Sequence, residues 1–138
     1  MVTQEQENLA KKVLNCAYKV HSFLGPGLLE SAYQACLRYE LTQQGFFVEC
    51  EKSLPLIYRG MTIECGYRID MVVEHNQIII ENKAVKELTD IHLAQILTYM
   101  RLSDISLGFL FNFNTQHLKN GIKRVILQGG ASSSPKNI

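Results

Sequence analysis

The sequence contains no tryptophan, only 3 prolines and no marked excess of either charge. Its 138 residues include 14 basic and 13 acidic side chains, which gives a formal net charge of +1. The composition therefore shows no overall basic charge of the kind that holds nucleic acid nonspecifically. Hydrophobic residues make up 46% and charged residues 20% of the chain, and these ordinary fractions exclude a disordered chain or a fibrous repeat. The length predicts one domain with a core that needs no disulfides.

Long hydrophobic runs are also missing. No run approaches the roughly 20 apolar residues that a membrane-spanning helix needs. The first 24 residues do not resemble a secretory signal peptide, because they carry several charged side chains. These are Glu5, Glu7, Lys11, Lys12 and Lys19. We therefore expect a cytoplasmic protein that does not associate with a membrane.

The cysteines lack the close spacing that is typical of a metal site. Structural zinc and iron–sulfur sites usually contain a pair such as Cys-x-x-Cys, and this sequence has none. In a reducing compartment we expect buried or half-buried thiols at all four positions. These positions are Cys16, Cys36, Cys50 and Cys65.

Three segments are predicted to be helices. Residues 5–24 have apolar side chains at three- and four-residue spacing, and a Gly-Pro-Gly sequence ends this helix. Residues 28–44 show the same pattern and stop before Gly45, a residue suited to a helix C-terminus. Residues 90–102 form the third predicted helix, with Thr89 as its N-cap.

Seven short segments, most of them rich in β-branched and aromatic residues, are predicted to be strands, with a tight turn at Arg59-Gly60. The order of elements predicts an α/β or α+β fold in which helices flank a central sheet. Residues 129–138 are rich in glycine, serine and proline and are expected to be a disordered tail, which leaves one domain over residues 1–128. The predicted strands are residues 46–52, 54–59, 61–67, 68–74, 77–83, 106–113 and 122–127.

The two strands on either side of His75-Asn76 place acidic residues together. If these two residues form a two-residue hairpin loop, Asp70 lies directly opposite Glu81. Opposed side chains on one face lie about 5 Å apart. Alternation along the strand places Lys83 on the same face as Glu81. The other face is expected to be core, with Ile69, Met71, Val73, Ile78 and Ile80.

Two opposed carboxylates repel each other unless a cation neutralises them or they share a proton. Mg²⁺ is commonly held by one or two carboxylates together with water and substrate phosphate. A nearby lysine can orient a water molecule and stabilise developing negative charge. Asp70, Glu81 and Lys83 could therefore hydrolyse a phosphodiester. The same residues, with Arg68, could instead form a surface salt-bridge cluster.

The spacing of these residues resembles a known signature. Asp70 followed by Glu81-Asn82-Lys83 resembles the Asp…Glu-x-Lys motif of the PD-(D/E)XK nuclease superfamily. Gln95 and Tyr99, on the next predicted helix, resemble the Gln-x-x-x-Tyr motif of its RecB-like branch. The superfamily name includes a proline before the aspartate, whereas this chain has Ile69 there.

An upstream segment resembles a smaller group within this superfamily. The stretch from Gly27 through Glu30 to Tyr33 is similar to the pattern of the small bacterial and archaeal GxxExxY proteins. The resemblance extends over roughly residues 8–127. Further similar stretches are residues 25–27, 66–70 and 112–114.

The resemblance implies a PD-(D/E)XK (restriction-endonuclease-like) core, a mixed central sheet flanked by helices. It implies that Asp70 and Glu81 are metal-binding carboxylates and that Lys83 is the catalytic lysine. Glu30 matches an acidic residue that contacts the metal directly or through water. Glu30 could alternatively do no more than stabilise the N-terminus of its helix.

The resemblance also implies residues that contact the substrate. Gln95 and Tyr99 match the motif that orients the site or contacts the substrate backbone. Tyr33 shares a helix face with Glu30 and could contact the substrate or be a core residue. Arg68 could hold a phosphate or pair with Glu81.

Basic residues gather toward the end of the sequence. Residues 115–138 contain Lys119, Lys123, Arg124 and Lys136 and no acidic residue. This segment could contact phosphates, or it could be a solvated strand edge and tail.

The sequence therefore predicts a nuclease that uses Mg²⁺ or Mn²⁺ to hydrolyse DNA or RNA. Two other functions stay open at this point. The chain could be a non-catalytic nucleic-acid-binding or assembly module on the same fold, or a phosphohydrolase acting on a small molecule. So small a domain could also gain phosphate-binding surface by forming a homodimer.

Overall fold

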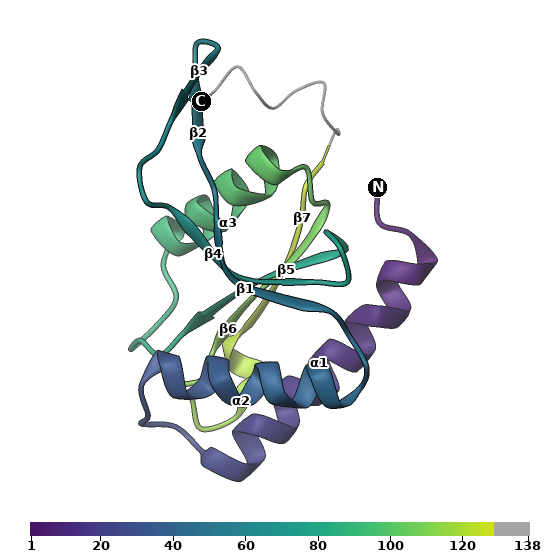
Figure 1. Cartoon of the computed structure of the whole chain (residues 1–138). Helices are drawn as coiled ribbons and strands as arrows, with labels where there is room; N and C mark the ends of the chain where they lie inside the picture. The colour runs from purple at the N-terminus through teal and green to yellow at the C-terminus, as the bar shows by residue number, and fades with distance from the viewer. Residues whose placement is uncertain (129–138) are drawn as a thin grey trace.

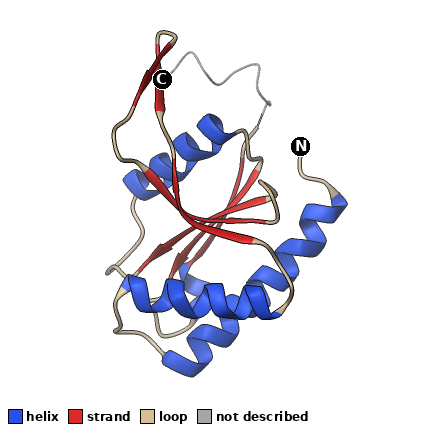
Figure 2. Ribbon diagram, viewed as in Figure 1, coloured by secondary structure: helices blue, strands red, loops and turns tan. Residues whose placement is uncertain are grey.

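A computed structural model describes residues 1–128, and the predicted tail lies outside the described residues. Helices α1 (Gln4–Leu24) and α2 (Glu30–Gln43) cover one face of a five-stranded sheet, and α3 (Asp90–Ser103) covers the other (Figures 1 and 2). A short 3₁₀ helix, η1 (Leu118–Gly121), precedes the last strand. This mixed sheet flanked by helices confirms the predicted fold class.

The strands of the main sheet follow the order β1-β4-β5-β6-β7. Only β5 and β6 run parallel, and the other neighbouring pairs are antiparallel. This order places β4 and β5, which carry the predicted acidic pair, inside the sheet rather than at its edge. The strands are β1 (Val48–Ser53), β4 (Arg68–Val73), β5 (Ile78–Lys83), β6 (Leu107–Asn112) and β7 (Ile122–Ile126).

Local signals set the helix ends. At α1, the side chain of Thr3 accepts the N–H of Gln6, and the side chain of Gln6 accepts the N–H of Thr3, which is a capping box. Helix α2 begins at Glu30, two residues later than predicted, because the backbone of Leu29 is still extended. Gly45, just beyond α2, has φ +89°, as expected after a helix. None of the helices within residues 1–128 has the length and hydrophobicity needed to cross a membrane.

The turn between β4 and β5 differs from the predicted two-residue loop. Residues 74–76 all have positive φ, and the N–H of Gln77 donates to the carbonyl of Val73 at 3.1 Å. The turn therefore takes four residues instead of two. The strand register is nevertheless the predicted one, with Val73 opposite Ile78.

Strands β2 (Leu56–Tyr58) and β3 (Met61–Ile63) form a separate two-stranded sheet that projects away from the main one (Figure 1). We call these strands and the turn between them the hairpin arm. Arg59 and Gly60 both have positive φ, which confirms the predicted tight turn. Strand β2 is shorter than predicted, because Pro55 cannot donate to a strand ladder.

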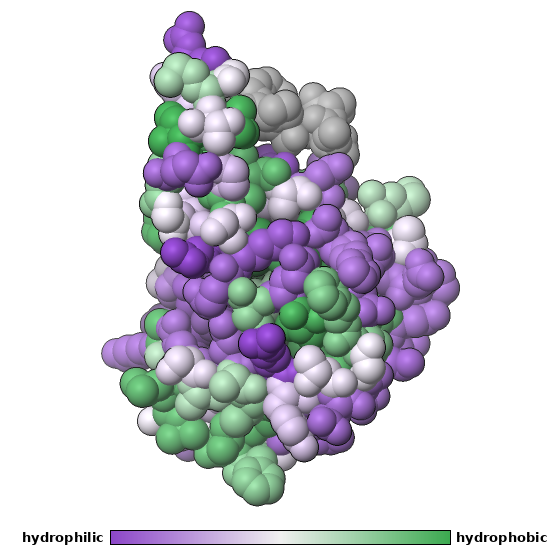
Figure 3. All heavy atoms as spheres, viewed as in Figure 1, coloured by the Kyte–Doolittle hydropathy of each residue, from purple (hydrophilic) through white to green (hydrophobic). Residues whose placement is uncertain are grey.

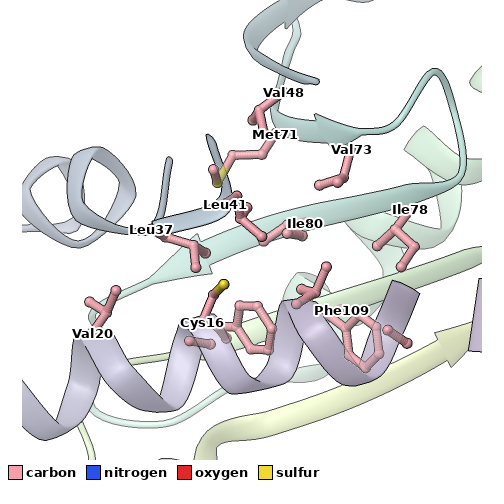
Figure 4. Packing of buried hydrophobic residues seen from close by; sticks show 14 of the residues in the cluster. Cys16, Val20, Leu37, Leu41, Val48, Met71, Val73, Ile78, Ile80 and Phe109 are labelled. Carbon is pink, nitrogen blue, oxygen red and sulfur yellow. The ribbon is translucent and has the colours of Figure 1, made fainter. Parts of the chain in front are cut away.

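Two hydrophobic clusters join the layers. The larger lies between the sheet and helices α1 and α2 (Figure 4), and the smaller lies under α3. The predicted core residues of β4 and β5 are all buried, but Ile69 packs with Leu54 in the smaller cluster. The larger cluster includes Cys16, Val20, Leu37, Leu41, Val48, Met71, Val73, Ile78, Ile80 and Phe109.

The cysteines are all free thiols. Cys16 is buried, and Cys36 and Cys50 are half-buried, as predicted. The prediction is wrong for Cys65, which is exposed because it lies in the loop between β3 and β4, outside both cores.

Candidate active site

The regular backbone pairing of β4 with β5 ends where the two acidic residues come together. The regular pairing ends at Met71 and Ile80. Beyond this pair, the backbone N–H of Asp70 donates to Glu81 Oε2 at 3.0 Å, and the N–H of Asn82 donates to Asp70 Oδ2 at 2.8 Å. Each carboxylate therefore accepts an N–H from the opposite strand, which brings the two side chains together as the register predicts.

This carboxylate pair, Asp70 and Glu81, is held in a low-dielectric environment. Glu81 is only 3% exposed. Burial, followed by the nearby charge of Asp70, raises the pKa of Glu81 to about 8. Burial also raises the pKa of Asp70, while the N–H of Asn82 and the charge of Lys83 lower it. Near neutral pH the pair therefore favours a shared proton or a bound cation.

Lys83 and Arg68 lie at the same end of these strands. Lys83 is half-buried at the end of β5, and Arg68 is exposed at the start of β4. The ion pairs found within residues 1–128 involve none of Asp70, Glu81, Lys83 and Arg68. The structure thus contradicts a surface salt-bridge cluster, since its central carboxylate is buried and its cations are not paired with it.

Glu30 approaches the end of β5 from α2. Its Oε2 accepts the backbone N–H of Ala84, the residue after Lys83, at 3.2 Å. Its charge also contributes to raising the pKa of Asp70. However, no three Cys, His, Asp or Glu side chains among residues 1–128 converge closely enough to hold one metal ion. Asp70, Glu81 and Glu30 therefore do not form a preassembled three-ligand cluster, and contact of Glu30 with a metal, direct or through water, stays a prediction.

Glu51 is a further acidic residue near the site that sequence analysis missed. It lies opposite Asp70, between the pairs Cys50–Met71 and Lys52–Ile69. Its charge contributes to raising the pKa values of Asp70 and Glu81. No sequence signal indicates this placement, because the hairpin arm separates β1 from β4 along the chain.

Gln34 links this additional acidic residue to the central strands. Its Nε2 donates to Glu51 Oε2 at 2.8 Å, and its Oε1 accepts from Asn82 Nδ2 at 3.4 Å. Gln34 lies one turn after Glu30 on α2, so its helical spacing from the GxxExxY pattern is the signal that could have identified it.

The predicted Gln-x-x-x-Tyr pair lies on α3. Gln95 Nε2 donates to the hydroxyl oxygen of Tyr99 at 3.1 Å. Burial raises the pKa of the almost fully buried Tyr99, and the charge of Glu81 raises it further. These two side chains are therefore close to the carboxylate pair. The neighbouring His92 has a capping role, since its Nδ1 accepts the N–H of Thr89 at 3.0 Å.

Of the two roles predicted for Tyr33, its burial favours the core residue over the substrate contact, since its side chain is fully buried. Its hydroxyl donates to the carbonyl of Gly25 at 2.6 Å and accepts the N–H of Leu28 at 3.1 Å. Its ring stacks on Phe113 with a centroid distance of 4.7 Å, and the N–H of Phe113 donates to the carbonyl of Lys83. Tyr33 thus joins the loop before α2 to the end of β5.

The chemistry of the donor set fits a divalent cation. Asp70 and Glu81 offer hard oxygen ligands, and their mutual repulsion in a buried position is relieved when a cation binds. Two carboxylates are sufficient for Mg²⁺, which commonly completes its coordination with water and substrate phosphate.

A mixed sheet with two carboxylates and a lysine at the ends of adjacent strands defines a nuclease-like α/β domain. The family model for the PD-(D/E)XK nuclease superfamily matches residues 7–125, and the chain belongs to this superfamily. No curated protein and no solved structure is significantly similar to the chain.

Proposed function

We propose that this protein is a Mg²⁺- or Mn²⁺-dependent nuclease that hydrolyses phosphodiester bonds in DNA or RNA. The observation that carries the proposal is the pair of the half-buried Asp70 and the buried Glu81, with Lys83 on the same strand as Glu81. A purely structural or binding module gains nothing from two carboxylates that repel each other in a buried position. Membership of a nuclease superfamily supports the same conclusion.

Each residue of the site has a distinct role in this proposal. Asp70 and Glu81 would hold the cation, which when bound supplies Lewis acidity at the phosphoryl group. Lys83 stabilises the negative charge that develops on the phosphate or orients the attacking water. Glu30, at the Ala84 backbone, acts through water rather than by direct contact.

The substrate is positioned by residues around this centre. Arg68 is exposed at the start of β4 and would hold a phosphate beside the scissile bond. Gln95 and Tyr99 would orient the site from α3. These assignments are supported by the positions of β4 and α3 next to the carboxylate pair.

The GxxExxY pattern supports a narrower assignment within the superfamily. Its glutamate approaches the end of β5, and its tyrosine holds the preceding loop against the same strand. We therefore propose that the chain is a GxxExxY-type protein that acts in the cytoplasm. A homodimer stays a prediction.

Cleavage assays test the nuclease proposal. Labelled single- and double-stranded DNA and RNA are incubated with the purified protein in Mg²⁺ or Mn²⁺. We expect cleavage that is lost in Lys83→Ala and in Glu81→Ala, because these variants remove the stabilising charge and a metal ligand. Lys86→Ala, which removes an exposed lysine from the loop after β5, is the matched control and should cleave normally. Absence of cleavage over the whole panel contradicts the proposal for these substrates.

Calorimetry distinguishes an enzyme from a binding module. We expect Mn²⁺ to bind the wild-type protein and not Asp70→Asn. Asp104→Asn is a suitable control, because Asp104 is exposed with a left-handed backbone that asparagine adopts readily. A nucleic-acid affinity that is the same with and without the metal, and the same in Asp70→Asn as in the wild type, would instead indicate a non-catalytic module.

A further inference from the structure

The hairpin arm is attached to the sheet at the end that carries the carboxylate pair. Strand β1 leads into the arm, and the chain returns from it into β4. At this junction Ser53 pairs with Arg68, and Asp70 follows two residues further along β4. The arm projects from this point beyond α3 (Figure 1). A ligand that reaches the site from this side therefore passes along the arm.

One face of the arm is apolar and open to solvent. The register pairs Leu56 with Ile63 and Tyr58 with Met61, so these four side chains share a face. Tyr58 is 47% exposed and Met61 is 61% exposed. Figure 3 shows hydrophobic residues on the arm below a hydrophilic tip. A two-stranded hairpin is too small to bury a hydrophobic core of its own. Packing within the arm therefore does not account for these exposed apolar side chains.

Two arginines lie at the ends of this apolar face. Arg59 is exposed at the tip of the arm, and Arg68 is exposed at its base. Neither takes part in an ion pair within residues 1–128. Glu64, just after β3, is the single acidic residue of residues 54–68, so the arm has a small excess of positive charge.

Two tyrosine rings connect the base of the arm to the surroundings of the carboxylate pair, one exposed and one buried. Tyr67 is 46% exposed, and its ring lies 6.4 Å from that of Tyr99, measured between centroids. Tyr99 in turn is close enough to Glu81 for the glutamate charge to raise its pKa. The base of the arm therefore lies next to the side chains that surround the carboxylate pair.

The size of the apolar face argues against a second copy of this chain as its partner. Strands of three residues extend about 10 Å and lie about 5 Å apart, so the face covers on the order of 100 Å². Stable protein interfaces bury about 800 Å² on each partner. A nucleobase, by contrast, stacks on a single aromatic side chain.

We propose that the hairpin arm binds a single-stranded stretch of nucleic acid next to the scissile bond. Tyr58 stacks on a base, and Arg59 and Arg68 contact the phosphates on either side. The inference rests on the proposed function for the class of ligand. It also explains how a chain of net charge +1 can bind an anionic polymer, since the contacts are local to the arm.

Fluorescence anisotropy tests this proposal with the full chain in EDTA, so that no cleavage occurs. The probes are fluorescein-labelled single-stranded DNA and RNA of about 12 nucleotides, with a duplex of the same sequence for comparison. We expect Tyr58→Ala to weaken single-strand binding about 5- to 100-fold and Tyr58→Phe to keep it. Tyr58→Leu should behave like Tyr58→Ala, because leucine is apolar but has no π-face.

Arg59 is tested by the salt dependence of binding. Loss of one phosphate contact should reduce the slope of log affinity against log salt by about 0.7 for a single strand in Arg59→Ala. Arg59→Lys should keep the slope. Tyr39→Ala is the matched control, because Tyr39 is 59% exposed on α2, away from the arm, and it should bind like the wild type.

Several results would overturn the proposal. The first is an affinity for single strands in Tyr58→Ala or Tyr58→Leu that equals that of the wild type. The second is a wild-type protein that binds no single strands. The third is a wild-type dimer that dissociates in Tyr58→Ala while nucleic-acid binding is unchanged. Failure of the nuclease proposal gives a different pattern, in which single-strand binding depends on Tyr58 but no cleavage follows on adding metal. Conversely, cleavage with an unchanged KM in Tyr58→Ala would overturn the arm's role alone.

Discussion

At the scale of single residues, the site depends on two neighbouring carboxylates, the half-buried Asp70 and the buried Glu81. Their meeting follows from the strand register, and each carboxylate accepts a backbone N–H from the opposite strand. Glu51 lies on the neighbouring strand and adds to the negative potential. Residue types and spacing indicated Asp70, Glu81 and Lys83, whereas Glu51 emerges only from the packing of β1 against β4.

The raised pKa of Glu81 makes the metal-free protein sensitive to pH. Its folded pKa of about 8 lies above the usual glutamate value. The protonated form is therefore favoured by folding, and this contribution is complete below about pH 4.3 and is lost as the pH rises toward 8. In EDTA, Glu81→Gln should be more stable than the wild type above pH 8 by up to about 5 kcal/mol, because each unit of pKa shift corresponds to about 1.4 kcal/mol. Thermal unfolding from pH 5 to 9 measures the difference.

The control for this experiment is Glu87→Gln, which changes an exposed glutamate in the loop after β5. It should follow the wild-type pH profile. Saturating Mn²⁺ should stabilise the wild type and not Glu81→Gln, because ligand binding favours the folded state. A pH profile that is the same in Glu81→Gln and the wild type would contradict the assigned pKa.

At the scale of elements, short loops place the helices against the strands. The Gly25–Leu28 loop has little regular structure of its own, and the hydroxyl of Tyr33 contacts both of its ends. The stack of Tyr33 on Phe113 connects this loop to β5 through the Lys83 carbonyl. Helical spacing indicated that Tyr33 faces the same side as Glu30, but it could not indicate whether that side is solvent or core.

Tyr33→Phe tests this role. The variant keeps the stacked ring and loses two hydrogen bonds, so we expect it to reduce the free energy of unfolding by about 1–3 kcal/mol. Urea denaturation measures the change, with the exposed Tyr39→Phe as the control. The folded variant should cleave substrate with the wild-type KM. A large rise in KM with an unchanged free energy of unfolding would indicate that Tyr33 contacts the substrate.

At the scale of the whole molecule, three layers fit closely around the sheet. Gly108 in β6 lies where side chains of β5 and α3 pack closely against the backbone. A Cβ at this position would lie 2.6 Å from Cγ2 of Ile79 and 3.0 Å from Sδ of Met100. Glycine is therefore required here by packing, since the backbone conformation itself is ordinary.

Gly108→Ala should destabilise the protein by about 1–3 kcal/mol, because the additional methyl group overpacks the smaller cluster. Chemical denaturation gives the value, with Thr62→Ala on the exposed arm as a control at a strand position outside both cores. A wild-type denaturation midpoint in Gly108→Ala would show that α3 can move away from the sheet without cost.

The sequence by itself determined the secondary-structure order, the fold class, the register of β4 with β5, and the residues that form the carboxylate pair. These depend on periodicity and spacing within short segments, which local chemistry controls. The tertiary structure decided the burial of Tyr33, the placement of Glu51 and Gln34, the position of Glu30 at the Ala84 backbone, and the separation of the hairpin arm from the main sheet. These depend on contacts between segments far apart in the chain, because packing rather than local propensity determines which side chains meet.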